Sequence, residues 1–146
     1  MATPTAHKDA QGQNDIDRNA RQYTDLDLFF GRKTTSKDIN KVTDVQAVKR
    51  SVRNLILTNH YEKPFHPEIG SGVRGILFEP MTPITAHILT LQIENVIENF
   101  EPRAKLISVT AQPNLDRNEY ECTISFYVVN TPTELVDLTV FLERLR

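Results

Sequence analysis

The chain has 146 residues, of which 39% are apolar, enough for the core of one domain of ordinary size. Lys and Arg number 17 against 19 Asp and Glu, and this formal charge of -2 indicates neither a nucleic-acid-binding nor a membrane-surface protein. One cysteine, Cys122, excludes an internal disulfide, and the lack of a signal-peptide core or of an apolar run of about 18 residues indicates a soluble intracellular protein.

The first part of the chain is polar. Residues 1–22 are predicted to form a disordered tail, because they hold too few apolar side chains to offset the entropy of ordering. Residues 23–146 are expected to form a single domain. Within it, residues 23–31 alternate acidic and apolar side chains and suit a short extended segment, and residues 32–41 suit a surface loop.

A first helix is predicted from Thr43 onward. Its apolar residues follow the three-and-four spacing of one helical face: Val45, Val48, Val52, Leu55 and Ile56. Thr43 or Asp44 can cap its N-terminus. Three basic residues lie elsewhere on this helix, either as a solvated face or as a contact surface for an acidic partner: Lys49, Arg50 and Arg53.

A loop of unusual length is predicted over residues 58–83. Four prolines and three glycines exclude a long regular element there. The loop also carries several large apolar residues, so it is expected to be pinned to the core, with one short helical turn around 73–78. A connection of this length inside a compact domain is usually functional.

The second helix is predicted to begin after Thr82, a good N-cap, with Pro83 in the first helical position. It ends at Glu101, because the following Pro102 disfavours a helical conformation before it. Its inward stripe consists of Leu89, Ile93, Val96, Ile97 and Phe100.

Three segments with a period of two then follow, at residues 105–112, 119–129 and 135–144. In the first of them, Ile107, Val109 and Ala111 alternate with polar residues. Turn-forming sequences separate the segments, so an antiparallel arrangement is indicated. The predicted fold class is α+β, with two main helices packed on one face of a small antiparallel sheet of three or more strands.

Few residues point to chemistry. His60, His66 and Glu68 lie within nine residues, but their spacing matches no zinc pattern. Cys122 alternates in phase with apolar residues, which favours a buried hydrophobe over a nucleophile. Gly70 and the next glycine form a "GSG" with no phosphate-binding frame around it. No metal and no cofactor is therefore expected.

Paired carboxylates leave one enzymatic alternative open, a peptidoglycan hydrolase that resembles lysozyme. Glycoside hydrolysis needs two carboxyl groups about 5 to 9.5 Å apart, and Glu68, Glu79 and Glu101 are candidates. In the common phage muramidases an aspartate or cysteine follows the catalytic glutamate after nine residues, and no glutamate of this chain has either at that offset.

Several stretches together resemble a known family. They are "YTDLDLFF", "VKRSVRNLILTN", "EKPFHPEIGSGVRGILFEPMTP", "IENFEPRAKL" and the closing strands, in this order over residues 23–146. The chain resembles the small baseplate wedge and sheath-initiator proteins of contractile phage tails, which have a counterpart in type VI secretion baseplates. Some relatives have carried a lysozyme label, which this chain does not support.

The resemblance implies a structural protein and not an enzyme. It implies a place in the tail baseplate of a virion, assembled in the host cytoplasm. The implied partners are other baseplate wedge proteins, the tail sheath protein and tail tube or hub proteins, with no nucleic acid and no membrane. It also implies a core fold similar to the linking domain of sheath proteins, whose sheet receives strands from neighbouring subunits.

The resemblance further implies two contact sites. Glu101, Pro102 and Arg103 match the triplet with which the family docks on the wedge core bundle, and both charged side chains are expected to project from the corner after the second helix. Without the family, a local ion pair that only holds the corner is the alternative. The predicted sheath-contact strand contains Val136, Leu138, Val140 and Leu142.

Overall fold

The structure is a computed structural model that describes residues 23–34, 37–129 and 131–144. The predicted disordered tail over residues 1–22 lies outside the described residues. The chain divides into two compact units, Met1–Asp44 and Val45–Arg146. That residues 23–146 act as one domain stays a prediction. Within the described ranges, no helix is long and apolar enough to cross a membrane.

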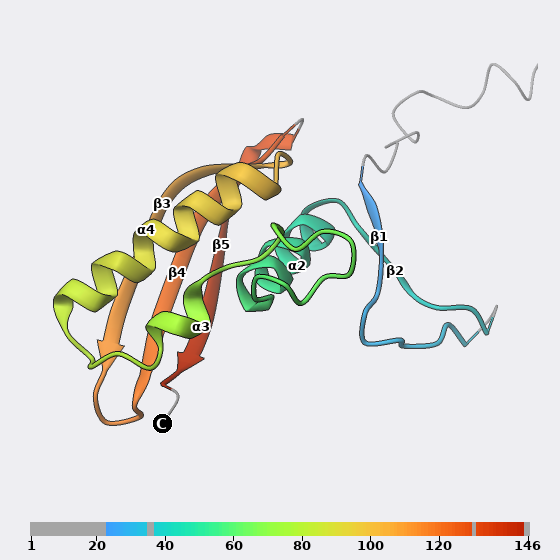
Figure 1. Cartoon of the computed structure of the whole chain (residues 1–146). Helices are drawn as coiled ribbons and strands as arrows, with labels where there is room; N and C mark the ends of the chain where they lie inside the picture. Colours follow the sequence, from blue (N-terminus) through green and yellow to red (C-terminus); the bar gives the residue numbers. More distant parts are fainter. Residues whose placement is uncertain (1–22, 35–36, 130, 145–146) are drawn as a thin grey trace, which may run out of the picture. The chain divides into compact units, whose positions relative to one another are not determined.

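The smaller unit contains a two-stranded antiparallel sheet of β1 (Thr24–Leu26) and β2 (Lys41–Thr43), shown in blue tones in Figure 1. The backbone N–H of Asp44 donates to the carbonyl of Tyr23 at 2.8 Å and closes its open end. The short extended segment predicted within residues 23–31 is thus confirmed over β1.

The larger unit consists of helices followed by a three-stranded sheet (Figure 1). Its elements are α2 (Asp44–Leu57), α3 (Val73–Ile76), α4 (Pro83–Phe100), β3 (Ala104–Asn114), β4 (Glu119–Val128) and β5 (Thr131–Glu143). The strands pair antiparallel in the order β3-β4-β5. The α+β class and the order helix, helix, strand, strand, strand are confirmed.

Helix α4 begins at the residue that the sequence predicts and ends one residue before the predicted Glu101, which is its C-cap. The side-chain oxygen of Thr82 accepts a hydrogen bond from the backbone N–H of Thr85 at 3.1 Å. Pro83 occupies the first turn, where a backbone N–H would have no acceptor within the helix, so the N–H that proline lacks is not needed. The helix ends at Phe100, one residue before the Glu101-Pro102 bond.

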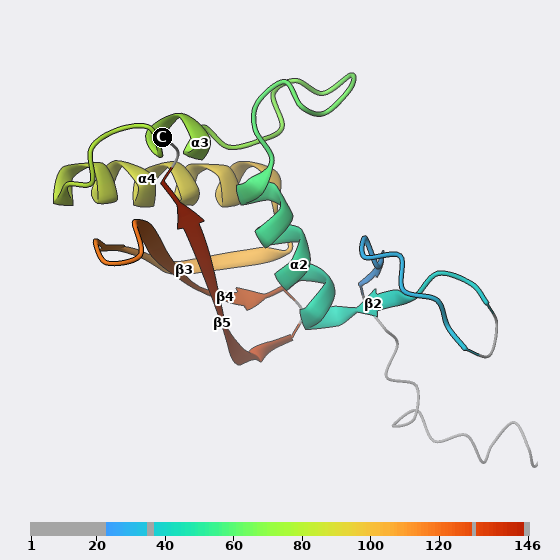
Figure 2. The ribbon, with the colours of Figure 1, turned by 90° about the horizontal axis from the view of Figure 1, so that it is seen from below.

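One face of the sheet carries the core. Five alternate residues of the central strand β4 are 1% exposed or less: Tyr120, Cys122, Ile124, Phe126 and Val128. The apolar stripes of α2 and α4 are buried with them, through Val48, Val52 and Ile56 on α2 and Leu89, Ile93 and Ile97 on α4. Figure 2 shows α4 lying along one side of the sheet. This packing is the helix-on-sheet layering predicted from the two periodicities.

A β-bulge changes the pattern of β3. The register shifts between Leu106 and Ser108, so that one extra residue stands opposite β4. Ile107 is consequently 51% exposed while Val109 is 8% exposed. The prediction that Ile107 continues the alternation of Val109 is wrong, because the bulge moves it to the other face.

The prediction that the apolar residues of the long loop pin it to the core holds only in part, because Val73 and Leu77 are buried whereas Phe65 is 98% and Phe78 57% exposed. Residues 61–68 are all exposed, and the loop is fixed to the core after them. Ser71 donates its hydroxyl to the carbonyl of Ile56 at 2.5 Å and its backbone N–H to the carbonyl of Thr58 at 2.7 Å. Gly70 has φ +149°, and a Cβ at this position would lie 2.6 Å from the carbonyl of Asn59, so only glycine fits there. The predicted helical turn is confirmed as α3.

Candidate functional site

The corner between α4 and β3 is built around one buried carboxylate. Glu101 is 4% exposed, and its Oε1 accepts from Arg103 Nε at 2.7 Å while its Oε2 accepts from Arg103 Nη2 at 3.1 Å. This is a bidentate ion pair across one residue, Pro102. The fixed φ of that proline holds the two side chains on the same side of the corner.

Helix α2 completes the corner. The hydroxyl of Ser51 donates a short hydrogen bond to Glu101 Oε2. Burial acts to raise the pKa of Glu101, but the hydrogen bonds from Arg103 and Ser51 outweigh it and hold the pKa below its usual value. Glu101 is therefore a charged group that ties α2 to the start of β3.

This geometry corrects one expectation about the triplet. Glu101 does not project from the corner, because both of its oxygens accept hydrogen bonds inside the chain. Pro102 is exposed, and the side chain of Arg103 is 26% exposed. The exposed part of the corner thus consists of Pro102 and part of the Arg103 side chain.

Sequence reasoning missed Ser51. It belongs to α2, and it lies three residues after the buried Val48 and one before the buried Val52. A small polar residue beside an apolar helical stripe is a usable signal, because such a position faces the core and needs a polar partner there.

The four residues of the predicted sheath-contact strand all point into the core. Val136, Leu138, Val140 and Leu142 of β5 are 4% to 7% exposed. Their side chains hold β5 in place and are not available to another protein. A contact by this strand must therefore use its backbone edge and the alternate side chains.

The direction of the β5 backbone groups follows from one hydrogen bond. The backbone N–H of Arg144 donates to the carbonyl of Asn118 at 3.0 Å. In an antiparallel pair every second residue faces the neighbouring strand, so the backbone N–H and C=O groups of residues 138, 140, 142 and 144 point toward β4. Residues 137, 139, 141 and 143 then direct theirs away from the sheet. Among the residues that the structure describes, no strand pairs with this outer edge.

The opposite edge of the sheet is less suited to strand pairing. Val129 donates to the carbonyl of Arg103 at 2.9 Å, and the pairing continues from there with the bulge at Ile107. Pro113 consequently falls in the outward row of β3, where it removes one donor. Of the two edges, the structure favours that of β5 for an added strand, although α2 lies beside β5 on this side in Figures 1 and 2.

The histidines and acids of the long loop form no metal site. His66 Nδ1 lies 3.0 Å from Glu68 Oε1, and both side chains are more than half exposed. Among the described residues, no group of three or more His, Cys, Asp or Glu side chains is placed to hold a metal ion.

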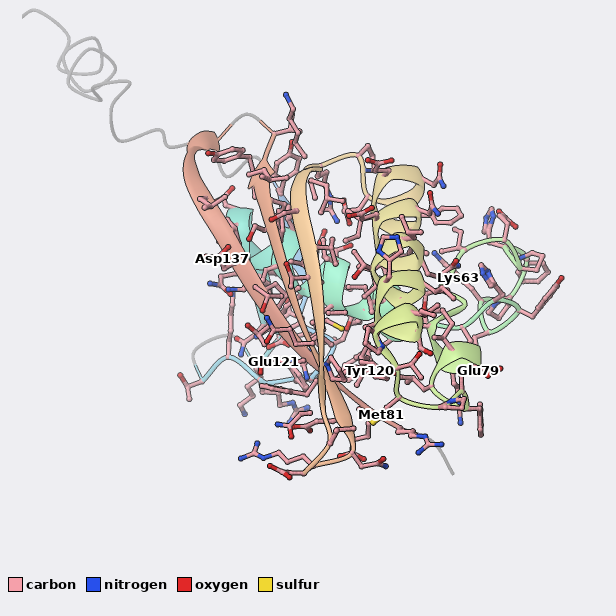
Figure 3. All side chains as sticks on the ribbon, turned by 90° about the vertical axis from the view of Figure 1, so that its left-hand side faces the viewer. Lys63, Glu79, Met81, Tyr120, Glu121 and Asp137 are labelled. Carbon is pink, nitrogen blue, oxygen red and sulfur yellow. The ribbon has the colours of Figure 1, made fainter. Side chains whose placement is uncertain are left out.

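Two of the carboxylates considered for hydrolysis, Glu79 and Glu101, are not arranged as an acid pair. Glu79 precedes α4 and Glu101 follows it, so the whole helix, about 27 Å at 1.5 Å per residue, lies between them. Figure 3 shows Glu79 beside α3, at the same end of α4 as Met81. Hydrogen bonds from the backbone N–H of Glu68 and from His66 lower the pKa of Glu68, whereas a general acid needs a raised pKa.

Cys122 lies in the middle of the core with 0% exposure. Burial raises the pKa of its thiol to about 12. A thiol in this environment is protonated and inaccessible, so the residue acts as a small hydrophobe, as predicted.

Known proteins match this chain in sequence and in fold. The sequence pattern of the family described as baseplate wedge protein gp25 matches residues 42–133. The baseplate wedge protein gp25 of Enterobacteria phage T4 is 31% identical over 113 residues, which cover 77% of this chain and 85% of that protein.

Two solved structures share the fold at low sequence identity. A protein from Geobacter sulfurreducens, provisionally described as a tail lysozyme, aligns with a TM-score of 0.63 and 22% identity over 68% of this chain and 89% of its own. A chain in the baseplate of the anti-feeding prophage aligns with a TM-score of 0.59 and 20% identity over 85% of this chain and 87% of its own. At these identities the likeness concerns the fold and carries no activity.

Proposed function

The chain belongs to the baseplate wedge protein gp25 family, and we propose that it is a structural component of the baseplate of a contractile tail. The observation that carries this proposal is the family match over residues 42–133, which includes the Glu101-Pro102-Arg103 corner and most of the sheet. Its partners are then other baseplate proteins, and it functions through protein–protein interactions.

The first contact proposed is a dock of the corner on the wedge core bundle. Glu101 fixes the plane of the Arg103 guanidinium through two hydrogen bonds, so little side-chain entropy remains to be lost when a partner binds. In this proposal Pro102 and Arg103 meet the partner, and Glu101 acts as a positioning residue. The local ion pair therefore does not compete with docking, because it positions the Arg103 side chain that meets the partner.

The second contact proposed is the attachment of the tail sheath protein at the outer edge of β5. A row of outward N–H and C=O groups at residues 137, 139, 141 and 143 is a template for an added strand. The buried side chains of Val136, Leu138, Val140 and Leu142 keep this template flat and in register. Tail tube or hub proteins are further proposed neighbours, with assembly in the host cytoplasm.

Two variants separate the two contacts. Arg103→Lys keeps a positive charge beside Glu101 but loses the planar fork, and Thr139→Pro removes one outward N–H of β5 without removing a bond of its own ladder. Tagged wild type and both variants are used to capture proteins from a tail-producing lysate, after circular dichroism has shown that each is folded. Retained proteins are identified by mass spectrometry.

The proposal predicts a different loss for each variant. Arg103→Lys loses the wedge proteins and keeps the sheath protein, and Thr139→Pro does the opposite. If both folded variants retain the same proteins as wild type, neither site is a contact. If wild type itself retains no tail protein, the structural role is wrong.

A further inference from the structure

A pocket lies at the end of the proposed sheath-binding edge. It has a volume of about 210 Å³ and lies between the C-terminal end of α2, helix α3 and the last residues of β5. Leu57, Leu77 and Leu142 form its apolar part, and Asn59, Glu62, Arg74 and Glu143 form its polar part. Leu57 is 50% exposed, so an apolar surface here faces solvent in the isolated chain.

The pocket adjoins the outer edge of β5 directly. Both Leu142, which points into the core, and Phe141, which points to the other face of the sheet, contribute to its lining. Residues on opposite faces of one strand can line the same pocket only where that pocket lies beside the strand. The pocket is therefore next to the outward N–H and C=O groups of residues 141 and 143.

An added strand would place a side chain in this pocket. The outward groups of residues 141 and 143 form the hydrogen-bonded pairs of an antiparallel addition, and Leu142 then stands opposite a residue in a non-hydrogen-bonded pair. Such residues point to the same face of the sheet, with Cβ atoms about 4.5 to 5.5 Å apart. The residue opposite Leu142 consequently faces the helices and enters the pocket at its apolar part, beside Leu57, Leu77 and Leu142.

The other face of the same edge is acidic. Glu143 stands directly opposite Glu119 on β4, which pairs with the exposed Arg117 at 3.7 Å, and Glu121 is the neighbour of Phe141 across the same two strands. Figure 3 shows Glu121 and Asp137 on the face of the sheet that is turned away from α4. Like charges in cross-strand pairs are destabilising, so a cation beside Glu143 would be favoured.

We propose that β5 receives an extended segment of another protein in which apolar and basic residues alternate, with the apolar residue opposite Leu142 in the pocket and a basic residue opposite Glu143. The inference rests on the proposed strand addition and names what the added strand must carry. One strand can carry both the apolar residue opposite Leu142 and the basic residue opposite Glu143, because neighbouring residues of a strand point to opposite faces of the sheet.

The chain's own N-terminal residues do not meet these conditions. Residues 1–22 contain only Met1 and Ile16 as large apolar residues, and Ile16 is flanked by Asp15 and Asp17. A strand centred on Ile16 would bring an aspartate opposite Glu143, which adds a like charge where a cation is needed. The sequence therefore points to a second protein as the source of the strand.

Synthetic peptides test the proposal on the full chain. The probe is a peptide of about ten residues that alternates lysine with valine, the length of an ordinary strand. Three matched peptides replace every valine by threonine, replace every lysine by glutamate, or keep the composition and break the alternation. Binding is followed by fluorescence anisotropy, and hydrogen exchange over residues 137–143 reports whether the β5 amides become protected.

Protein variants separate the pocket from the edge. Leu57→Gln places a polar group in the pocket wall, and Leu91→Gln is the matched control, because Leu91 is 45% exposed on α4 and does not line the pocket. Thr139→Pro removes an outward N–H and tests strand addition itself.

The alternating peptide is expected to bind wild type and Leu91→Gln alike and to protect the β5 amides. Its affinity falls about tenfold for Leu57→Gln, as it does for the threonine and glutamate peptides with wild type, and binding is lost for Thr139→Pro. If Leu57→Gln binds as tightly as wild type while Thr139→Pro does not bind, strand addition stands and the pocket inference is wrong. If no peptide protects the β5 amides, or the peptide without alternation binds equally well, both are wrong.

Discussion

The carboxylate of Glu101 and the guanidinium of Arg103 form a bidentate pair, with oxygen to nitrogen distances of 2.7 and 3.1 Å, across a single proline. The same carboxylate accepts from Ser51 of α2. One buried acid thus connects the end of α4, the start of β3 and the middle of α2, and its charge state matters for the stability of the corner.

Glu101→Gln is expected to lower the free energy of unfolding by about 2 kcal/mol near neutral pH, because charge-assisted hydrogen bonds are replaced by neutral ones. The pKa of Glu101 is lowered from 4.5 in the folded state, so its contribution is present above pH 4.5 and is lost as the pH falls below that value. Urea unfolding from about pH 7 to about pH 3 measures this, and the difference between wild type and variant should shrink on the acid side.

A control on the same helix separates this effect from general acid sensitivity. Glu98 is exposed near the end of α4, and Glu98→Gln should leave the stability nearly unchanged over the same range. An equal loss for both variants, or a difference for Glu101→Gln that does not shrink in acid, would contradict the assignment.

The N-terminus of α4 offers a second prediction. Thr82→Ala removes the side-chain acceptor of the Thr85 N–H and should cost about 1 kcal/mol of unfolding free energy. Thr90→Ala is the matched change inside the same helix, where the hydroxyl only donates to the carbonyl of Ala86 at 3.1 Å. Because alanine is the better helix former, thermal melts should show little loss for Thr90→Ala. Equal melting temperatures for the two variants would rule out the cap.

Local patterns predicted the elements whose causes are local. The Thr82-Pro83 start and the Glu101-Pro102 end of α4 depend on residues within one turn, and the alternation of β4 needs only a buried face. The corner was only partly predictable. A local ion pair of Glu101 with Arg103 is one of the alternatives that the sequence leaves open, but the contribution of Ser51 depends on how α2 packs against the end of α4. The burial of the Glu101 side chain depends on the same packing.

The bulge of β3 shows where the same reasoning fails. A period of two gives no sign of an extra residue, because Ile107 and Val109 fit the alternation equally well. Which of them is buried depends on the register with β4, a pairing between residues distant in the chain.

Substitutions at these two positions test the bulge. Val109→Ser should cost about 2 kcal/mol of unfolding free energy, because it buries a hydroxyl and removes apolar contacts in the core. Ile107→Ser should cost less than about 1 kcal/mol, since the side chain is 51% exposed. Chemical denaturation of both variants gives the comparison, and a larger loss for Ile107→Ser would mean that the strand follows the regular alternation.

The thiol of Cys122 reports on the opening of the core. With 0% exposure and a pKa raised to about 12 by burial, it should not react with an aromatic disulfide reagent in the folded protein at neutral pH. Addition of urea should release one thiol per chain along the same transition that circular dichroism reports. Rapid labelling without urea would show that the sheet opens locally, in conflict with a core centred on β4.

The hydrolase alternative makes a prediction that the geometry contradicts. A retaining or inverting mechanism needs two carboxyl groups within about 10 Å, one of them with a raised pKa. Here Glu79 and Glu101 lie at opposite ends of α4, and the pKa values of Glu68 and Glu101 are lowered. Purified protein should therefore leave the turbidity of a cell-wall suspension unchanged between about pH 5 and about pH 8. Clearing that is lost in Glu68→Gln or Glu79→Gln, with the fold intact, would establish an enzyme and overturn the purely structural role.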